Sequence, residues 1–120
     1  MAGNGTIADI LETSDAVILS PIVIGELHDG FRNGTRYREN LQILDRFCTR
    51  PRTVNVPVTD TTAEWFAEIK QGLRRRGRPI PINDVWIAAV CMEHGAALLS
   101  KDGHFGHIDG LLRRPLAEQP

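Results

Sequence analysis

The spacing of apolar residues changes along the chain, and these changes predict an alternation of strands and helices. Runs of continuous or alternating apolar residues, four to six residues long, are typical of short strands. Such runs predict strands at 16–19, 53–58 and 96–99, with a last one around 111–112. Apolar residues spaced three or four apart predict helices at 6–12, 21–32, 36–49, 61–76 and 85–94.

Residues typical of helix ends flank most of these segments. Serine followed by proline, a Thr-x-x-Glu capping box and an Asn-Asp pair all favour a helix start. These starts are expected at Ser20 with Pro21, at Thr61 to Glu64, and at Asn83 with Asp84. Glycine just past the last turn favours a stop, which is expected at Gly77 and Gly95.

Each long helix is expected to bury one face. The inward residues are expected to be Val23, Leu27, Gly30 and Phe31 in the first, Leu41, Leu44, Phe47 and Cys48 in the second, Trp65, Phe66, Ile69 and Leu73 in the third, and Val85, Ala88, Ala89 and Met92 in the fourth. Pro57 lacks a backbone N–H, so its strand is expected at a sheet edge.

Strands that alternate with helices indicate an α/β fold. We expect one domain over residues 1–120, a three-layer sandwich with a mainly parallel central sheet flanked by helices. The apolar fraction of 42% and the charged fraction of 24% are those of a soluble globular protein. A net charge of −1 excludes a globally basic nucleic-acid binder, although local patches remain open.

Cellular location is expected to be cytoplasmic. No apolar run reaches the length of a membrane span, and no signal-peptide pattern begins the chain. Cys48 and Cys91 lie within predicted helices and form no CxxC pair, so we interpret them as reduced core thiols.

Three acidic residues lie near predicted strand ends or helix starts. Glu26 follows the strand at 16–19, Asp84 opens the fourth long helix, and Asp102 follows the strand at 96–99. In a parallel sheet these positions meet at the carboxyl edge, where oxygen ligands can bind a cation. The simpler interpretation is that Asp84 is only a helix cap and Asp102 only a turn residue.

Basic residues and histidines offer further candidates. Arg74, Arg75, Arg76 and Arg78 form either a solvated helix end that complements the helix dipole or a phosphate-contacting patch. His104 and His107 are spaced as zinc ligands can be, but no companion cysteine or carboxylate pattern accompanies them.

Three segments together resemble a known family. Ser20 to Leu27 (SPIVIGEL), Ile82 to Ala89 (INDVWIAA) and Leu98 to Phe105 (LLSKDGHF) are similar, in order and spacing, to the acidic motifs of PIN domains. Within that family, the chain resembles the ribonuclease toxins of VapBC toxin–antitoxin systems.

The resemblance implies a metal-dependent endoribonuclease. Glu26, Asp84 and Asp102 would be the catalytic acids and the ligands of Mg²⁺ or Mn²⁺, with Asn83 and Ser100 supporting them. It also implies an RNA substrate such as tRNA or rRNA, a cognate VapB-type antitoxin, a homodimer and no membrane partner.

The start of the chain departs from the family pattern. The family begins with a central strand that ends in a first acidic residue, and this sequence shows neither, because Asp9 and Asp15 do not match the pattern. We therefore expect Met1 to be an internal methionine or the chain to be truncated, with weak stability and poor cleavage. An alternative is a catalytically silent PIN scaffold that binds RNA or antitoxin without cutting.

Overall fold

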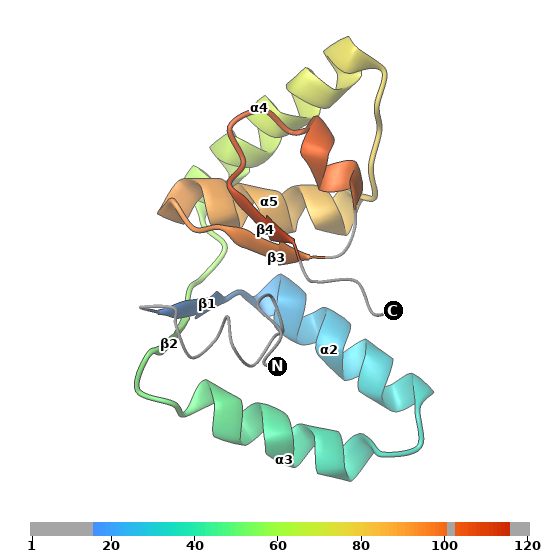
Figure 1. Cartoon of the computed structure of the whole chain (residues 1–120), viewed down its shortest axis with the longest axis vertical. Helices are drawn as coiled ribbons and strands as arrows, with labels where there is room; N and C mark the ends of the chain where they lie inside the picture. The colour runs from blue at the N-terminus through green and yellow to red at the C-terminus, as the bar shows by residue number, and fades with distance from the viewer. Residues whose placement is uncertain (1–15, 101–102, 116–120) are drawn as a thin grey trace, which may run out of the picture. The chain divides into compact units, whose positions relative to one another are not determined.

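The computed structural model describes residues 16–100 and 103–115. They fall into two compact units, which divide between residues 57 and 58. We call residues 16–57 the N-terminal unit and residues 58–100 with 103–115 the C-terminal unit, and we describe each by itself (Figure 1). The expected helix at 6–12 and the expected features of the chain start lie outside the described residues.

The N-terminal unit is a helical hairpin with a pair of parallel strands. Its elements are β1 (Val17–Leu19), α2 (Pro21–Asn33), α3 (Tyr37–Cys48) and β2 (Thr53–Asn55). β1 and β2 run parallel, with Val17 opposite Thr53 and Leu19 opposite Asn55. The pairing continues to Val56, whose N–H donates to the Leu19 carbonyl at 2.8 Å. β2 is shorter than predicted because Pro57 has no N–H with which to extend it.

The start of α2 confirms the prediction from sequence. Ser20 is the N-cap residue, and its hydroxyl accepts a hydrogen bond from the Val23 N–H at 3.4 Å. Pro21 stands in the first turn, where its missing N–H costs nothing. The expected burial along α2 is wrong, since none of its side chains is buried and Gly30 is exposed.

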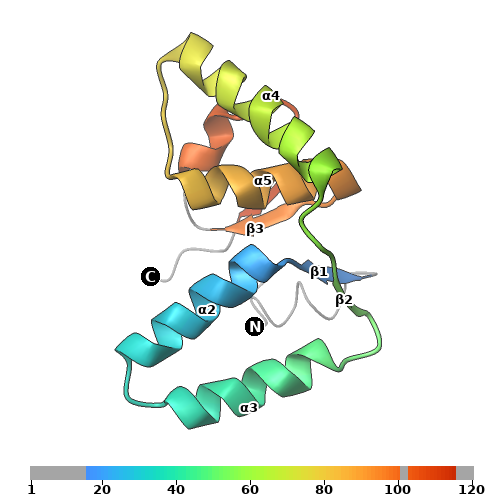
Figure 2. The same ribbon diagram turned by 180° about the vertical axis from the view of Figure 1, so that it is seen from behind.

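The C-terminal unit places one helix between another helix and a strand pair. Its elements are α4 (Asp60–Arg76), α5 (Ile82–His94), β3 (Leu98–Ser100), the 3₁₀ helix η1 (Gly103–His107) and β4 (Arg113–Pro115). α4 packs against α5 on the side seen from behind (Figure 2). β3 and β4 run parallel, with Leu98 opposite Arg113, so the last strand lies about two residues later than predicted.

The core of the C-terminal unit is made largely by α5. Apolar residues on nearly all sides of this helix are buried, as expected for a helix covered on both faces. The buried apolar residues of this unit are Ile69, Leu73, Val85, Ile87, Ala88, Ala89, Val90, Leu98, Phe105 and Ile108. Phe66 and Trp86 add a stacked aromatic contact between α4 and α5, with ring centroids 4.1 Å apart.

Two predicted helix starts are corrected by the structure. The capping box of α4 joins Thr59 and Thr62, because the helix begins at Asp60 and not after Thr61. Helix α5 begins at Ile82 with Pro81 as its N-cap residue, which places Asn83 and Asp84 inside the first turn. The predicted stops are confirmed, since Gly77 and Gly95 have positive φ angles of 64° and 63°.

The fold class is confirmed as α/β with parallel strands. The described strands form two separate pairs, β1 with β2 and β3 with β4, and each pair belongs to one unit. No helix within the described residues is long and apolar enough to cross a membrane.

Candidate active site

Asp84 lies in the first turn of α5, and the local sequence explains why. Pro81 has an extended backbone, with φ −56° and ψ 143°, and a proline disfavours helical backbone at the residue before it, so the helix begins just after Pro81. The Pro81 carbonyl accepts the Asp84 N–H at 3.0 Å. A carboxylate at this position interacts favourably with the helix dipole. The Asp84 side chain is 18% exposed, so it is largely shielded but still reaches solvent.

His104 of η1 holds the Asp84 carboxylate. Its Nε2 atom lies 2.9 Å from Asp84 Oδ2, a charge-assisted hydrogen-bond distance. Phe105, the next residue, is buried, and its ring centroid lies 4.6 Å from that of His104. The buried phenylalanine therefore anchors η1, and η1 presents the imidazole to Asp84.

The pattern of residues did not predict this contact. His104 was considered only as a zinc ligand together with His107, whereas in the structure it pairs with an acid twenty positions away. The His-Phe pair after Asp102 was the available signal, because a histidine beside a buried anchor has a fixed direction.

Two further predicted site residues also belong to the C-terminal unit. Asn83 is exposed in the same helical turn, and Ser100 is half-buried at the carboxyl end of β3. Both take part in interactions within the chain. Asp102 lies outside the described residues, so its predicted role stays a prediction.

Glu26 belongs to the N-terminal unit. It is exposed in the second turn of α2 and has an interaction partner in the chain. Asp84 belongs to the other unit, so the predicted convergence of Glu26 with Asp84 and Asp102 stays a prediction.

The donor set fits a hard divalent cation. Carboxylate, amide and hydroxyl oxygens, such as those of Asp84, Asn83 and Ser100, are the ligands that Mg²⁺ and Mn²⁺ prefer. His104 contacts one carboxylate oxygen of Asp84, Oδ2. The other oxygen of that carboxylate is Oδ1. Among the described residues, to which Asp102 does not belong, no three histidine, cysteine or acidic side chains lie close enough to hold a metal ion.

The four predicted RNA-binding arginines lie at the end of α4 and just beyond it, and all are exposed. Arg76 is already engaged inside the C-terminal unit. Its Nη1 donates to the His107 carbonyl at 2.7 Å, and its Nη2 forms an ion pair with the Asp109 carboxylate. Arg76 therefore links the end of α4 to the end of η1, and the Asp109 carboxylate lies beside its charge.

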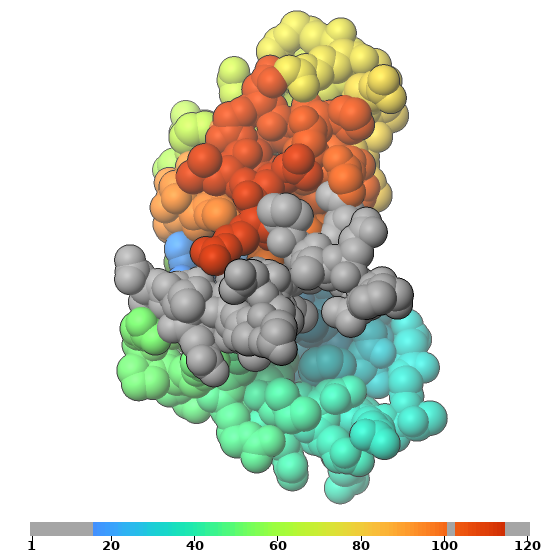
Figure 3. Space-filling view, viewed as in Figure 1, coloured from blue at the N-terminus to red at the C-terminus, as the bar shows by residue number. Residues whose placement is uncertain are grey.

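The end of η1 forms part of a continuous surface with the segment that leads into β4 (Figure 3). Arg113 of β4 approaches this segment closely, since a Cβ at Gly106 would lie 3.2 Å from its Nη2. Glycine at 106 therefore leaves the room that the arginine occupies.

Sequence comparison shows the family. The PIN domain family matches residues 3–111, which is nearly the whole chain. The chain belongs to the PIN domain family, in agreement with the three motifs noted above.

Named relatives narrow the class further. The chain is 36% identical over 96 residues to "Ribonuclease VapC5" of Mycobacterium tuberculosis, covering 80% of this chain and 71% of that protein. It is 28% identical over 87 residues to "Ribonuclease VapC4" of the same organism, covering 72% and 67% respectively.

Solved structures share the fold. VapBC2 from Rickettsia felis, bound to a DNA fragment from its promoter, superposes with a TM-score of 0.77 at 23% identity, covering 89% of this chain and 80% of that one. FitAB bound to a DNA fragment gives 0.72 at 24% identity, covering 96% and 85%. VapBC-1 from Haemophilus influenzae gives 0.77 at 22% identity, covering 91% and 83%.

Proposed function

We propose that this chain is an endoribonuclease toxin of a toxin–antitoxin pair and depends on a divalent metal. The observation that carries the proposal is the Asp84 carboxylate, fixed by His104 at the start of α5 in a chain of the PIN family. The names of two relatives supply the reaction class, since both are ribonucleases of the VapC type.

Glu26, Asp84 and Asp102 would hold Mg²⁺ or Mn²⁺. The bound ion would lower the pKa of a water molecule and offset the negative charge of the scissile phosphate. The part of Asp84 is to present one carboxylate oxygen while the imidazole of His104 holds the other. Such outer hydrogen bonds fix the direction of a ligand and raise its affinity for the metal.

Similar proteins of known structure also support a proposal about binding partners. Relatives solved as VapBC and FitAB assemblies support an antitoxin of the VapB type as a protein partner. We further propose RNA, such as tRNA or rRNA, as the substrate and a homodimer as the toxin's own assembly. The exposed arginines at the end of α4 would contribute phosphate contacts.

Cleavage of RNA by the purified chain tests the proposal. We expect cleavage with Mg²⁺ or Mn²⁺ and none with EDTA. Asp84→Asn should lower the rate by about a hundredfold or more, since it removes a ligand charge. Asp45→Asn, an exposed substitution in α3, is the matched control and should leave the rate unchanged.

RNA binding without metal-dependent cleavage would favour the silent scaffold instead. Measuring binding by fluorescence anisotropy in the same buffers separates the two functions, because the scaffold predicts retained affinity and no product with either metal.

A further inference from the structure

A hollow of about 290 Å³ lies at the junction of α4 and α5, within the C-terminal unit. Its apolar lining comes from Leu73, Pro79, Ile80 and Val85. Its size is close to the lower limit of small-ligand pockets, roughly 300 Å³. A flat fragment the size of a nucleobase fits such a space better than a large ligand does.

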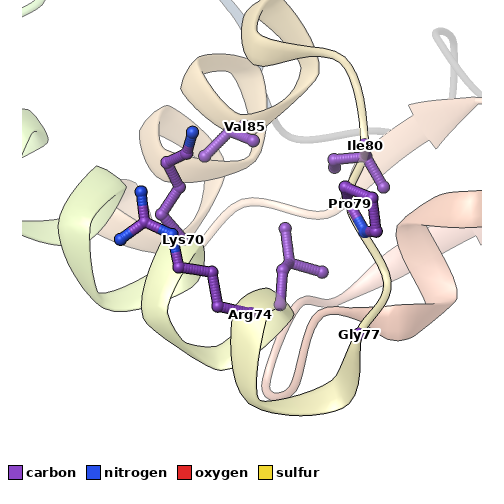
Figure 4. Close-up of a pocket in the computed structure, with 7 residues that line it drawn as sticks. Lys70, Arg74, Gly77, Pro79, Ile80 and Val85 are labelled. Atoms are coloured by element: carbon purple, nitrogen blue, oxygen red, sulfur yellow. The ribbon is translucent and has the colours of Figure 1, made fainter.

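Two cations border this hollow on one side. Lys70 and Arg74 come from successive turns of α4, and their side chains extend along the side opposite Pro79 and Ile80 (Figure 4). Within the described part of the chain, neither side chain forms an ion pair with an acid. Two unpaired cations beside an apolar floor complement a ligand that joins an anion to an apolar plane.

We propose that this hollow is a nucleotide subsite for single-stranded RNA, with a base on the apolar floor and its phosphate at Lys70 and Arg74. The inference rests on the proposed ribonuclease function for the identity of the ligand. The floor has aliphatic side chains and no side-chain hydrogen-bond donor, so the subsite accepts any base by contact and does not read its edge.

The subsite also divides the arginine run by role. Arg74 belongs to the hollow, whereas Arg76 is engaged with His107 and Asp109. Pro79 and Ile80 of the pocket wall lead directly into the first turn of α5, which carries Asp84. RNA held here would therefore be bound by the same helix start that carries a candidate catalytic acid.

Binding of a labelled single-stranded RNA of about twelve nucleotides in EDTA tests the cations. The double variant Lys70→Gln with Arg74→Gln should weaken binding about tenfold and lower the log–log salt slope by about 1.4, for two lost phosphate contacts. The charge-matched control, Arg46→Gln with Arg114→Gln, alters two exposed arginines and should leave the slope unchanged. Equal effects of both pairs would overturn the subsite.

Removing part of the apolar floor tests the base contact. Ile80→Ala keeps the charge and removes apolar contact surface, so it should weaken RNA binding roughly fivefold with no change in salt slope. Circular dichroism checks that the variant folds. Unchanged affinity in a folded variant would show that no base lies there.

A titration of the wild-type chain needs no variant at all. Addition of uridine 5′-monophosphate should shift backbone amide resonances of residues 70–85, and uridine or inorganic phosphate alone should shift them less. Shifts confined to other residues would refute the subsite. If the double variant weakens the binding of an acidic peptide or an antitoxin but not the binding of RNA, the hollow serves a protein partner. That outcome would also refute the RNA subsite.

Cleavage assays keep this inference apart from the proposed function. With Mg²⁺, the Lys70→Gln and Arg74→Gln variant should show a raised KM and an unchanged kcat, as expected for lost uniform binding. Resonance shifts at 70–85 without any cleavage by the wild type would contradict the ribonuclease function and support the subsite. Cleavage by the wild type without those shifts would support the ribonuclease and refute the subsite.

Discussion

Helices α2 and α5 both have 13 residues, yet they differ sharply in burial. In α5, the residues Val85, Ile87, Ala88, Ala89 and Val90 are buried, whereas α2 has no buried residue. The same contrast extends to the two units. Among the described apolar residues of the N-terminal unit only Leu44 and Val56 are buried, and Ile43 is 55% exposed.

The difference bears on how firmly each candidate acid is held. Asp84 stands on a helix packed on two sides and is bonded to an imidazole that a buried phenylalanine anchors. Glu26 stands on a helix whose apolar residues are only half covered. Regions with few buried apolar contacts open locally at lower free energy. Asp84 is therefore firmly held, and Glu26 lies on the unit that opens more easily.

Truncation of a core side chain in each unit should give the largest difference. Leu73→Ala removes a 4%-exposed side chain from the α4–α5 core and should lower the free energy of unfolding by about 2–5 kcal/mol. Leu27→Ala, on the half-covered face of α2, should cost less than about half as much. Urea unfolding measures both. Equal losses would contradict the contrast between the units.

Hydrogen exchange should show the same contrast in the unaltered chain. Amides in the middle of α4 and α5 are expected to exchange about a hundredfold more slowly than those in the middle of α2 and α3. The reason is that the better-packed unit opens locally less often. Mass spectrometry of peptides from each helix measures this. Uniform protection across both units would show that they open together.

The helix ends show what local sequence can predict. Ser20 with Pro21, Gly77 and Gly95 were all predicted correctly, because each acts through its own backbone or a hydrogen bond three residues away. The capping box was misplaced because two candidate boxes overlap, the predicted one of Thr61 with Glu64 and the observed one of Thr59 with Thr62. Thr62 prevails through a tertiary contact, since its hydroxyl donates to Glu93 Oε1 at 2.6 Å.

The site shows what local sequence cannot predict. The position of Asp84 near a helix start was predicted because the acid and the residues that open the helix are neighbours in the sequence. Its bond to His104 was missed because nothing periodic links residues in α5 and η1. The engagement of Arg76 by Asp109 was missed for the same reason, since the two are 33 positions apart. Packing of distant elements decides such contacts.

The two cysteines offer a chemical measure of packing. Burial raises the pKa of the Cys91 thiol from 9.0 to about 11. At about pH 8 its thiolate fraction is therefore roughly a hundredfold below that of an unshifted thiol, and alkylation should slow accordingly. The rate is measured with iodoacetamide in a Cys48→Ala variant, folded and in urea. A folded rate close to the urea rate would contradict the burial of Cys91.

The same shift predicts a loss of stability at high pH. The folded state favours the protonated thiol, so the contribution is fully present below pH 9.0 and is lost as the pH rises toward about 11. Urea unfolding at several pH values should show this decline in the Cys48→Ala variant. The additional substitution Cys91→Ala should remove this part of the decline, because it removes the titrating thiol.

The smallest effect concerns the candidate site itself. His104→Ala removes the group that orients Asp84, so we expect the midpoint of Mg²⁺ activation to rise by about 10- to 100-fold. His104→Gln, which can still donate a hydrogen bond, should recover part of the loss. His28→Ala in α2, whose ring lies 6.4 Å from that of Phe31, is the matched control in the N-terminal unit and should leave the midpoint unchanged.

A Mg²⁺ titration of RNA cleavage distinguishes positioning from general destabilisation. If His104 acts through Asp84, the midpoint rises while the maximal rate at saturating metal is largely kept, and Asp84→Asn with His104→Ala is no worse than Asp84→Asn alone. Additive losses in that double variant would mean that the two residues act independently. The 2.9 Å contact would then stabilise η1 without orienting the carboxylate.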